Sequence, residues 1–443
     1  MSETVWDSIV IGGGPGGSAA ATFLAKAGRQ VLVLEKETFP RFHIGESLLP
    51  YNKAIFEEMG VLPTLEAHGF IKKFGAQFHL GNGSKATGFV FKEGKFTRHT
   101  EAFQVERAVF DDLLLKHART SGAEVREGWT VERVSHEADG VEVLARDPNG
   151  QSHGLRARFL IDASGRGNMT GNQENIRDVH PRLKKIAVFG HFNGVMRDPG
   201  SKGGDTVIVR LENKWFWLIP ISGEKISVGC VIDRDEFSSA KLPPAEVFWS
   251  WVNQSPPLRE RMKDAVMVGE IQATGDFSYR NRRLVGPRLL RVGDAAGFMD
   301  PIFSAGVYLA MLSGKLAARA VGESLKAGDD GAKRLLAYEK RVRSAMTVYW
   351  EMVERFYTTP FMEVFLEPRA RWNLPAAVNA ILAGELEGSL GMRLRLRIFF
   401  WIVRMQSRWP LVPRISFAPI AHTETPPMPI ETASAGIPEG RSP

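Results

Sequence analysis

Cysteine is almost absent from this chain of 443 residues, since Cys230 is the only one. No disulfide can form within the chain, and the apolar pattern of residues 227–232 is typical of a buried strand in which the thiol contributes packing. Long apolar runs are missing as well. The basic and aromatic segment 392–404 is shorter than the roughly 20 apolar residues that a membrane-spanning helix needs. The sequence therefore excludes a disulfide-stapled fold and a transmembrane span.

Several functional signatures are also lacking. The ten histidines are scattered, and neither a metal-ligand spacing nor a Ser-His-Asp arrangement stands out. The net charge of +7 comes without a helix-turn-helix, zinc-finger or RNA-binding pattern, so nucleic acid is not expected as a partner. The first 30 residues begin with an acidic stretch and run into a glycine-rich loop, which is unlike a signal peptide. We expect a cytoplasmic globular protein.

What is present begins with a strand, a glycine-rich turn and a helix. Residues 7–11 form a short apolar strand, residues 12–17 hold the glycines, and residues 18–26 favour a helix. In such a G-x-G-x-x-G loop the glycines permit the tight turn, the approach of a pyrophosphate and the close packing of the helix, whose N-terminus carries the phosphates. We predict a dinucleotide site that includes Gly12, Gly14, Pro15 and Gly17.

An acidic residue follows where this interpretation requires it. A second apolar strand, residues 31–34, ends in Glu35, about where a carboxylate accepts hydrogen bonds from a ribose diol. This spacing favours a dinucleotide site over a turn that is merely rich in glycine.

Three further segments favour FAD over NAD, because they resemble the glutathione-reductase-like flavoproteins. Residues 104–111 resemble the R-x-x-F-D element that opens a helix, residues 159–166 the strand that returns to the flavin, and residues 290–297 the G-D-A segment. Each segment alone is also compatible with an ordinary strand end and turn. The resemblance implies cofactor contacts for Arg107, Asp162, Gly165 and Asp294.

Tryptophan is rare in proteins, yet two of the ten lie in the hexapeptide Trp215-Phe216-Trp217-Leu218-Ile219-Pro220. Alternating aromatic residues that end in proline are also typical of a buried strand. On a flavoprotein scaffold, however, W-x-W-x-I-P resembles the signature of the flavin-dependent halogenases. In that family two indoles separate the flavin from the organic substrate.

The resemblance to these halogenases covers about residues 5–370, and it is closest to members that act on phenols, pyrroles and other electron-rich rings. Residues 45–50 match the G-E-S-L-L-P stretch, which places Ser47 at the cofactor. Residues 69–76 match the segment with the essential lysine, and the register selects Lys73 rather than Lys72. Without this register, a solvated surface lysine would be the simpler interpretation.

Residues 300–309 resemble the loop over the flavin ring, whose backbone amides hold the halide in the family. Here those amides belong to Ala305 and Gly306. Many relatives have Ser or Thr where this chain has Ala305, and a halide held by N–H groups is compatible with that change.

The resemblance implies that reduced FAD, dioxygen and chloride or bromide yield hypohalous acid, which halogenates a phenol- or pyrrole-type ring. Lys73 would polarise the hypohalous acid or carry the halogen, and Trp215 and Trp217 would keep substrate from the flavin. A separate flavin reductase would supply the reduced cofactor, and the substrate would be free or tethered to a carrier protein. A hydroxylating monooxygenase and a geranylgeranyl-reductase-like enzyme are the alternatives on this scaffold.

The order of these segments predicts an α/β fold in which a Rossmann-like FAD-binding domain is interleaved with an antiparallel substrate sheet. We assign residues 1–170 and 286–330 to the FAD-binding part, and 171–285 to the sheet. Residues 331–417 are expected to be helical and residues 418–443 disordered. For the basic segment 392–404, a helix with solvated arginines is the simplest interpretation, with peripheral membrane contact or an acidic carrier protein as alternatives.

Overall fold

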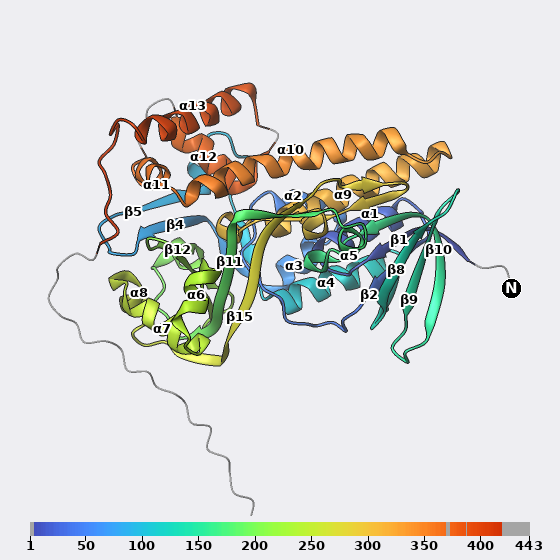
Figure 1. The fold of residues 1–443 in the computed structure, drawn as a ribbon, viewed down its shortest axis with the longest axis horizontal. Helices are drawn as coiled ribbons and strands as arrows, with labels where there is room; N and C mark the ends of the chain where they lie inside the picture. The colour runs from blue at the N-terminus through green and yellow to red at the C-terminus, as the bar shows by residue number, and fades with distance from the viewer. Residues whose placement is uncertain (1–3, 369–372, 387, 419–443) are drawn as a thin grey trace, which may run out of the picture.

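Two eight-stranded sheets organise the molecule (Figure 1). The computed structural model describes residues 4–368, 373–386 and 388–418. The first sheet has a parallel centre in the order β17-β10-β1-β2-β7, extended by antiparallel pairing of β16 with β17 and by the β8–β9 hairpin on β10. Its strands are β1 (Val5–Ile11), β2 (Val31–Glu35), β7 (Glu124–Glu127), β8 (Thr130–His136), β9 (Val141–Arg146), β10 (Ser152–Asp162), β16 (Val285–Gly286) and β17 (Leu289–Arg291).

Helices cover this sheet and bring distant segments to the glycine loop. The helix α1 (Pro15–Lys26) starts directly after β1, and α4 (Arg107–Thr120) and α9 (Gly306–Ala327) pack beside it. The crossing of α1 and α9 is tight, because a Cβ on Gly314 would lie 2.3 Å from the carbonyl oxygen of Gly16. The short helices α2 (Asn52–Met59), α3 (Leu62–His68) and α5 (Met169–Gln173) complete this part.

The second sheet has the order β18-β15-β11-β14-β13-β12-β4-β5 and is antiparallel except between β12 and β4. Its strands are β4 (Gly75–Leu80), β5 (Ala86–Val90), β11 (Arg177–Asn193), β12 (Thr206–Arg210), β13 (Trp215–Pro220), β14 (Ile226–Asp233), β15 (Val266–Asn281) and β18 (Gly297–Phe298). A separate two-stranded sheet pairs β3 (Ile71–Lys73) with β6 (Ala102–Gln104).

The second sheet is not confined to the range 171–285 assigned from the sequence. Its strands β4 and β5 come from within the first 170 residues, and β18 from the return segment. The apolar residues of β4 alternate, with Ala76, Phe78 and Leu80 buried in the largest core cluster. This strand pairs with its neighbour β5 on one side and, on the other, with β12, which lies about 130 residues later in the chain.

Side chains along β13 point alternately toward the two faces of the second sheet, and each face packs against a different core. Trp215 and Trp217 belong to the largest core cluster, which also includes residues of the first sheet. Phe216 and Leu218 belong to a separate core under α7 (Pro244–Asn253) and α8 (Pro256–Met262). The helix α6 (Arg234–Ala240) lies on the same outer side. The period of two in the strand thus directs both indoles toward the first sheet.

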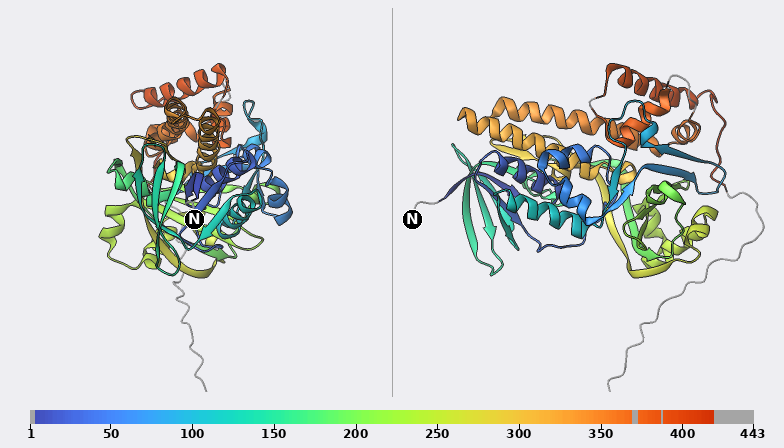
Figure 2. Two further views of the ribbon diagram at one scale, coloured as in Figure 1. Left: turned by 90° about the vertical axis from the view of Figure 1, so that its right-hand side faces the viewer. Right: turned by 180° about the vertical axis from the view of Figure 1, so that it is seen from behind.

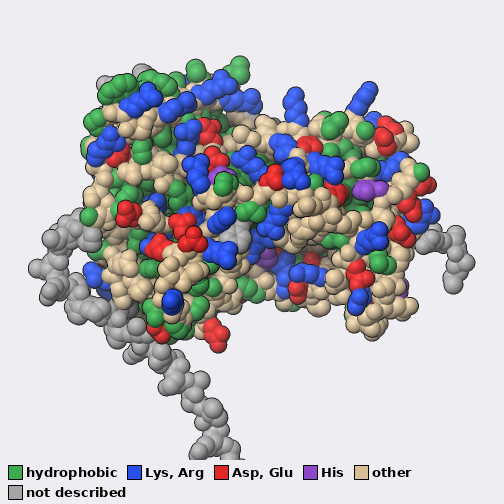
Figure 3. Space-filling view, viewed as in Figure 1, with side chains coloured by type: hydrophobic (Ala, Val, Ile, Leu, Met, Phe, Trp, Pro, Cys, Tyr) green, Lys and Arg blue, Asp and Glu red, His purple; other side chains and the backbone are tan. Residues whose placement is uncertain are grey.

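The C-terminal helices lie along one side of both sheets (Figures 1 and 2). They are α10 (Ala332–Phe356), α11 (Thr359–Phe365), α12 (Leu374–Ala383) and α13 (Leu390–Gln406). The expected tail 418–443 lies, apart from residue 418, outside the described residues. Within the described part of the chain, no helix has the length and apolarity to cross a bilayer. Basic and apolar side chains share the rim over α13 (Figure 3).

Candidate active site

A cavity of about 750 Å³ runs from the glycine loop to the inner face of the second sheet. Most of the residues proposed from the sequence line it. These are Gly12, Gly14, Pro15, Glu35, Ser47, Arg107, Gly165, Trp215, Trp217, Asp294, Ala305 and Gly306. Gly17, Lys73 and Asp162 do not line it.

The glycine loop has the backbone geometry that its sequence predicts. Gly12 has φ of 97°, and a Cβ there would lie 2.5 Å from the carbonyl oxygen of Ala163. Gly17 is equally restricted, since its Cβ would lie 1.9 Å from the carbonyl oxygen of Gly12. Gly14 differs: a Cβ there would meet only the Arg41 guanidinium, at 3.7 Å, so the space in front of it is open to the cavity.

Two acidic side chains face the cavity from opposite ends of the nucleotide region. Glu35, at the end of β2, accepts hydrogen bonds from the backbone N–H groups of Gly13 at 2.6 Å and Glu37 at 2.8 Å. Asp294 borders the cavity, and among the described residues no protein donor contacts its carboxylate. Loss of hydration raises the pKa of Asp294 to about 6, although the charges of Arg166 and Arg107 oppose the shift.

Arg107 begins α4 and holds the loop in front of it. Its guanidinium pairs with Asp111 through contacts of 2.7 and 2.8 Å and donates to the carbonyl oxygens of Ile44 at 2.8 Å and Gly45 at 3.2 Å. Burial, together with the Arg107 charge, lowers the pKa of the neighbouring His43 to about 4, so this imidazole is neutral at pH 7. Arg107 therefore shapes the cavity wall at residues 43–45.

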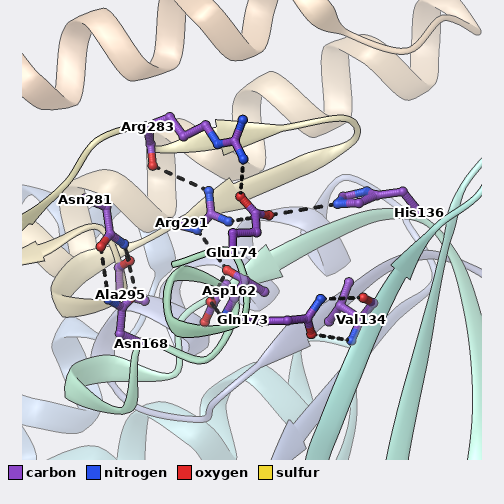
Figure 4. A network of polar contacts seen from close by, with 11 residues as sticks. Val134, His136, Asp162, Asn168, Gln173, Glu174, Asn281, Arg283, Arg291 and Ala295 are labelled. Carbon is purple, nitrogen blue, oxygen red and sulfur yellow. Dashed lines mark hydrogen bonds and ion pairs between the residues drawn. The ribbon is translucent and has the colours of Figure 1, made fainter. Parts of the chain in front are cut away.

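Asp162 does not occupy the cofactor position expected for it. Its carboxylate is fully buried and accepts hydrogen bonds from the backbone N–H groups of Ser164 and Thr170 and from the Thr170 hydroxyl. Thr170 in turn accepts a hydrogen bond from Arg291, which pairs with Glu174 at 2.7 Å (Figure 4). The chain folds back over β10 at this point, so Asp162 fixes the turn that presents Gly165 to the cavity.

The two tryptophans lie side by side on β13. Their ring centroids are 5.8 Å apart with an interplanar angle of 52°. Trp217 has room because the directly opposed residue on β14 is Gly229, where a Cβ would lie 2.1 Å from the indole. The indole N–H of Trp217 donates to Ser227 at 3.1 Å. Both rings are buried and fixed, and both border the cavity.

Lys73 lies just behind the cavity wall, with only 2% of its surface exposed. Its ammonium donates to the Ser47 hydroxyl at 2.8 Å and to the Leu48 carbonyl oxygen at 3.3 Å. The Ser47 hydroxyl also contacts that of Thr206 at 2.9 Å. Burial lowers the pKa of Lys73 to about 8, and the charge of Asp205 opposes the shift only partly. Lys72, by contrast, is exposed and pairs with Glu101 at 3.4 Å.

The register of β12 and β13 places the hydrogen-bonded cluster of Lys73, Ser47 and Thr206 beside the tryptophans. Ile208 on β12 lies directly opposite Trp217, and Thr206 lies two residues earlier on the same face. Thr206 and Ile208 both line the cavity. Ser47, which carries the contact to Lys73, is therefore held on the sheet face that presents the indoles.

The loop before α9 supplies backbone donors at the same end of the cavity. Ala305 is the N-cap of α9 and Gly306 is its first residue. The first turn of a helix leaves backbone N–H groups without intrahelical acceptors, and these groups carry the positive end of the helix dipole. The arrangement can hold a small anion, as the sequence pattern predicts.

A hydrogen-bonded relay that sequence reasoning missed joins this loop to the tryptophans. The indole N–H of Trp215 donates to the Tyr357 hydroxyl at 2.9 Å, which donates to the Asp300 carboxylate at 2.6 Å. The Lys185 ammonium lies 4.0 Å from the centre of the Tyr357 ring. Burial raises the pKa of Asp300, although the hydrogen bond from Tyr357 opposes the shift. In the sequence, Asp300 is only the first residue of the loop motif, and Tyr357 belongs to no motif.

The helix α10 closes one side of the cavity, which the sequence did not predict either. Its cavity-lining residues recur at helical spacing and are Val342, Met346, Tyr349 and Val353. This periodicity is visible in the sequence, but it predicts a buried helix face and not what that face covers.

The nucleotide end of the cavity fits a flavin dinucleotide on structural grounds. Open space lies at Gly14 before the N-terminus of α1, where a pyrophosphate would bind. Glu35 ends β2 beside this loop, and Asp294 offers a carboxylate that no donor of the described residues contacts, so it is open to a polyol chain. The remaining volume lies against the indoles and α10.

The comparisons with known proteins agree with this geometry. The FAD binding domain family model matches residues 6–355. A 1H-pyrrole-2-carbonyl-(peptidyl-carrier protein) chlorinase of Pseudomonas fluorescens is 30% identical over 398 residues, which cover 84% of this chain and 89% of that protein. The corresponding brominase of Pseudoalteromonas luteoviolacea is 33% identical over 365 residues, which cover 81% and 88%. The solved structure of the flavin-dependent brominase Bmp2 has a TM-score of 0.81 at 30% identity and covers 91% of this chain and 100% of its own.

Proposed function

Since this chain belongs to the flavin-dependent halogenases, we propose that it chlorinates or brominates a phenol- or pyrrole-type ring with hypohalous acid that Lys73 guides. The observation that carries the proposal is the arrangement on one sheet face. Trp215 and Trp217 form a fixed indole wall, and the Lys73–Ser47–Thr206 cluster lies on the same face within the family's cofactor-binding fold.

When bound in its reduced form, FAD would supply two of the four electrons that reduce dioxygen, and the halide would supply the other two as it becomes hypohalous acid. The residues of the glycine loop, Glu35 and Asp294, which line the cavity, would hold this cofactor. The amides of Ala305 and Gly306 hold the halide at the N-terminus of α9, where the helix dipole favours an anion.

The indole wall determines what reaches the substrate. Because Trp215 and Trp217 are buried, packed against each other and hydrogen-bonded through both N–H groups, they cannot swing aside without breaking these contacts. The indoles would keep an aromatic substrate from direct contact with the flavin, while a small oxidant passes them. This separation favours halogenation over direct hydroxylation.

Lys73 acts through its charge or through its free amine. As an ammonium it donates a hydrogen bond to hypohalous acid, which makes the halogen more electrophilic. As a neutral amine it can take the halogen from hypohalous acid, with release of water, and pass it to the ring, whose displaced proton returns to the amine. The Ser47 hydroxyl, which now accepts its hydrogen bond, borders the cavity and marks where the ammonium would meet the oxidant.

The substrate carrier and the source of reduced flavin are inferred from the relatives and from the glycine-rich loop. Those two relatives act on pyrrole-2-carbonyl groups attached to a peptidyl-carrier protein, so we extend the proposal to a ring that is either free or carrier-tethered. The sequence holds one glycine-rich dinucleotide loop, at residues 12–17, and FAD takes it. A separate flavin reductase therefore delivers the reduced cofactor.

The test is mass spectrometry of substrates incubated with the enzyme, FAD, a flavin reductase, NADH and chloride or bromide. The panel includes phenols, free pyrroles, tryptophan and a carrier protein loaded with pyrrole-2-carbonyl. Halogenated products support the proposal. Products that gain one oxygen would instead identify a monooxygenase, and reduced isoprenoids a reductase of the geranylgeranyl type.

A further inference from the structure

The helix α13 and the chain that follows it carry most of the net charge of the protein. Residues 388–418 contain six arginines and no acidic residue, so they account for six of the seven net positive charges. Two of these arginines are engaged within the protein: Arg395 lies over the Phe96 ring, and Arg414 pairs with the buried Glu363 at 3.0 Å. The other four, Arg393, Arg397, Arg404 and Arg408, are exposed and have no ion pair among the described residues.

Large apolar side chains stand among these arginines. Leu390 is 84% exposed, Leu394 57% and Trp401 53%, and beyond the helix Trp409 is 59% exposed and Leu411 44%. Positions 390, 394, 397, 401 and 404 follow one another at steps of three or four, which is one face of an α-helix, and Arg408 continues this spacing in the turn after α13. We call these residues, together with Arg393, Trp409 and Leu411, the α13 stripe.

The opposite face of α13 anchors the helix to the enzyme. Its buried residues are Met392, Leu396, Phe399, Phe400, Val403 and Gln406. Gln406 donates to the buried Glu363 of α11 at 2.7 Å, and the Phe399 and Phe361 rings are in edge contact at 5.7 Å. The stripe is therefore presented outward by a fixed helix at the rim of the molecule, where Figure 3 shows basic and apolar side chains together.

We propose that the α13 stripe attaches the enzyme reversibly to the surface of an anionic lipid bilayer. Arginine combined with tryptophan and leucine is the composition of helices that lie in the plane of the membrane interface, where guanidinium groups meet lipid phosphates and the apolar side chains enter the acyl boundary. Charge complementarity alone would also suit an acidic patch on a protein, but five large leucine and tryptophan side chains stand exposed among the arginines and match the acyl boundary of a bilayer. The stripe has only positive charge, which suits a diffuse anionic surface.

The experiment is co-sedimentation of the FAD-loaded full-length protein with vesicles. Vesicles of phosphatidylcholine and phosphatidylglycerol at 3:1 are compared with pure phosphatidylcholine. Wild type should bind the anionic vesicles, bind the neutral ones far more weakly, and dissociate as salt is raised. Arg397→Gln/Arg404→Gln should weaken anionic binding about thirtyfold, since each basic residue near such a surface contributes about a factor of five. Leu394→Ser/Trp401→Ser should weaken it about tenfold or more.

Two matched controls lie on α10. Lys333→Gln/Lys340→Gln removes the same charge from exposed positions, and Leu336→Ser removes an apolar side chain that is 62% exposed. Both should bind like wild type. Equal loss in the control and stripe variants, or wild-type binding that ignores lipid charge, overturns the proposal. The vesicle assay needs no turnover, so its outcome is independent of whether the enzyme halogenates.

One further outcome would reassign the stripe. If wild type ignores both vesicles while Arg397→Gln/Arg404→Gln slows turnover of carrier-tethered pyrrole-2-carbonyl but not of a free ring, the surface docks an acidic carrier domain. The membrane proposal is then wrong.

Discussion

Replacement of Lys73 by methionine separates catalysis from stability. Methionine keeps the length of the buried side chain and removes its charge and its hydrogen bonds to Ser47 and Leu48. Lys72→Met is the matched control one residue away, where the side chain is exposed and pairs with Glu101. We expect Lys73→Met to bind FAD and consume dioxygen normally while losing a hundredfold or more of its halogenated product. Lys72→Met should stay within about tenfold of wild type.

The structure also predicts the sign of the stability change. Lowering the pKa of Lys73 from 10.5 to about 8 corresponds to a cost of about 3 kcal/mol for holding the charge in the folded state. The two hydrogen bonds that methionine loses offset part of this gain. Lys73→Met should therefore unfold at the same urea concentration as wild type or a higher one, with a gain of up to about 2 kcal/mol.

The pH dependence of this group follows the same reasoning. Below about pH 8, Lys73 is charged in both the folded and unfolded states, so its burial destabilises the folded protein by the full amount of about 3 kcal/mol. As pH rises from about 8 to 10.5, the folded protein has already lost the proton that the unfolded chain keeps, so this destabilising contribution disappears. Activity discriminates between the two roles: it falls as pH rises through about 8 if the ammonium donates a hydrogen bond, and rises if the free amine carries the halogen.

The assay is parallel oxygen uptake and halogenated product for wild type and both variants, with urea unfolding of each. Normal halogenation by Lys73→Met would refute the role of the lysine. A loss of more than about 2 kcal/mol in stability would show that Lys73 is mainly structural, and an inactive Lys72→Met would show that the register is wrong.

Three other predictions concern the cofactor loop, the halide loop and the relay through Tyr357. Gly14→Val should fold but lose FAD, because the valine side chain enters open cavity space. Gly17→Val should unfold the loop, since a Cβ there lies 1.9 Å from the Gly12 carbonyl oxygen. Flavin absorbance and circular dichroism after gel filtration distinguish the two outcomes, and full flavin occupancy in Gly14→Val would contradict the cofactor assignment. Ala305→Ser should keep halogenation within about tenfold, whereas Gly306→Pro removes an N–H donor and should cost about 3 kcal/mol in kcat/KM for halide. Ala305 has ψ of −11°, which proline disfavours in its predecessor, so circular dichroism must show that α9 remains; unchanged halide dependence would mean that the halide binds elsewhere. Tyr357→Phe should destabilise the protein by about 1–3 kcal/mol in urea unfolding, because it leaves the Trp215 indole N–H and the Asp300 carboxylate without their partner. Tyr338→Phe, which removes a single hydrogen bond to the Arg291 carbonyl oxygen, should cost less, and equal losses would show that the relay adds nothing.

The parts of the site that the sequence predicted are those determined by local geometry. The glycine loop is a continuous strand-turn-helix, so residues 7–26 contain the information for its shape. Trp215 and Trp217 share a face because they are two residues apart in a strand. Their placement beside the cavity came from the family resemblance, since a strand of alternating aromatic residues has the same pattern in any core.

Asp162 and Asp294 show where local patterns fail. Each follows an apolar strand and precedes a turn, so the sequence treats them alike. Folding surrounds Asp162 with donors from the Thr170 segment and leaves Asp294 facing the cavity. Which carboxylate stays available depends on how the chain returns over each strand, which is a tertiary property. The parallel pairing of β4 with β12 was unpredictable for the same reason.

The cavity wall on α10 makes the pocket sensitive to chain length. Successive residues of an α-helix are rotated by about 100°, so one inserted or deleted residue in the turn 328–331 between α9 and α10 would re-aim the whole helix. The apolar set Val342, Met346, Tyr349 and Val353 would then give way to its neighbours, for example Arg343, Thr347, Trp350 and Glu354. A single deletion at this surface turn would thus bring charged side chains into a pocket wall that is now apolar.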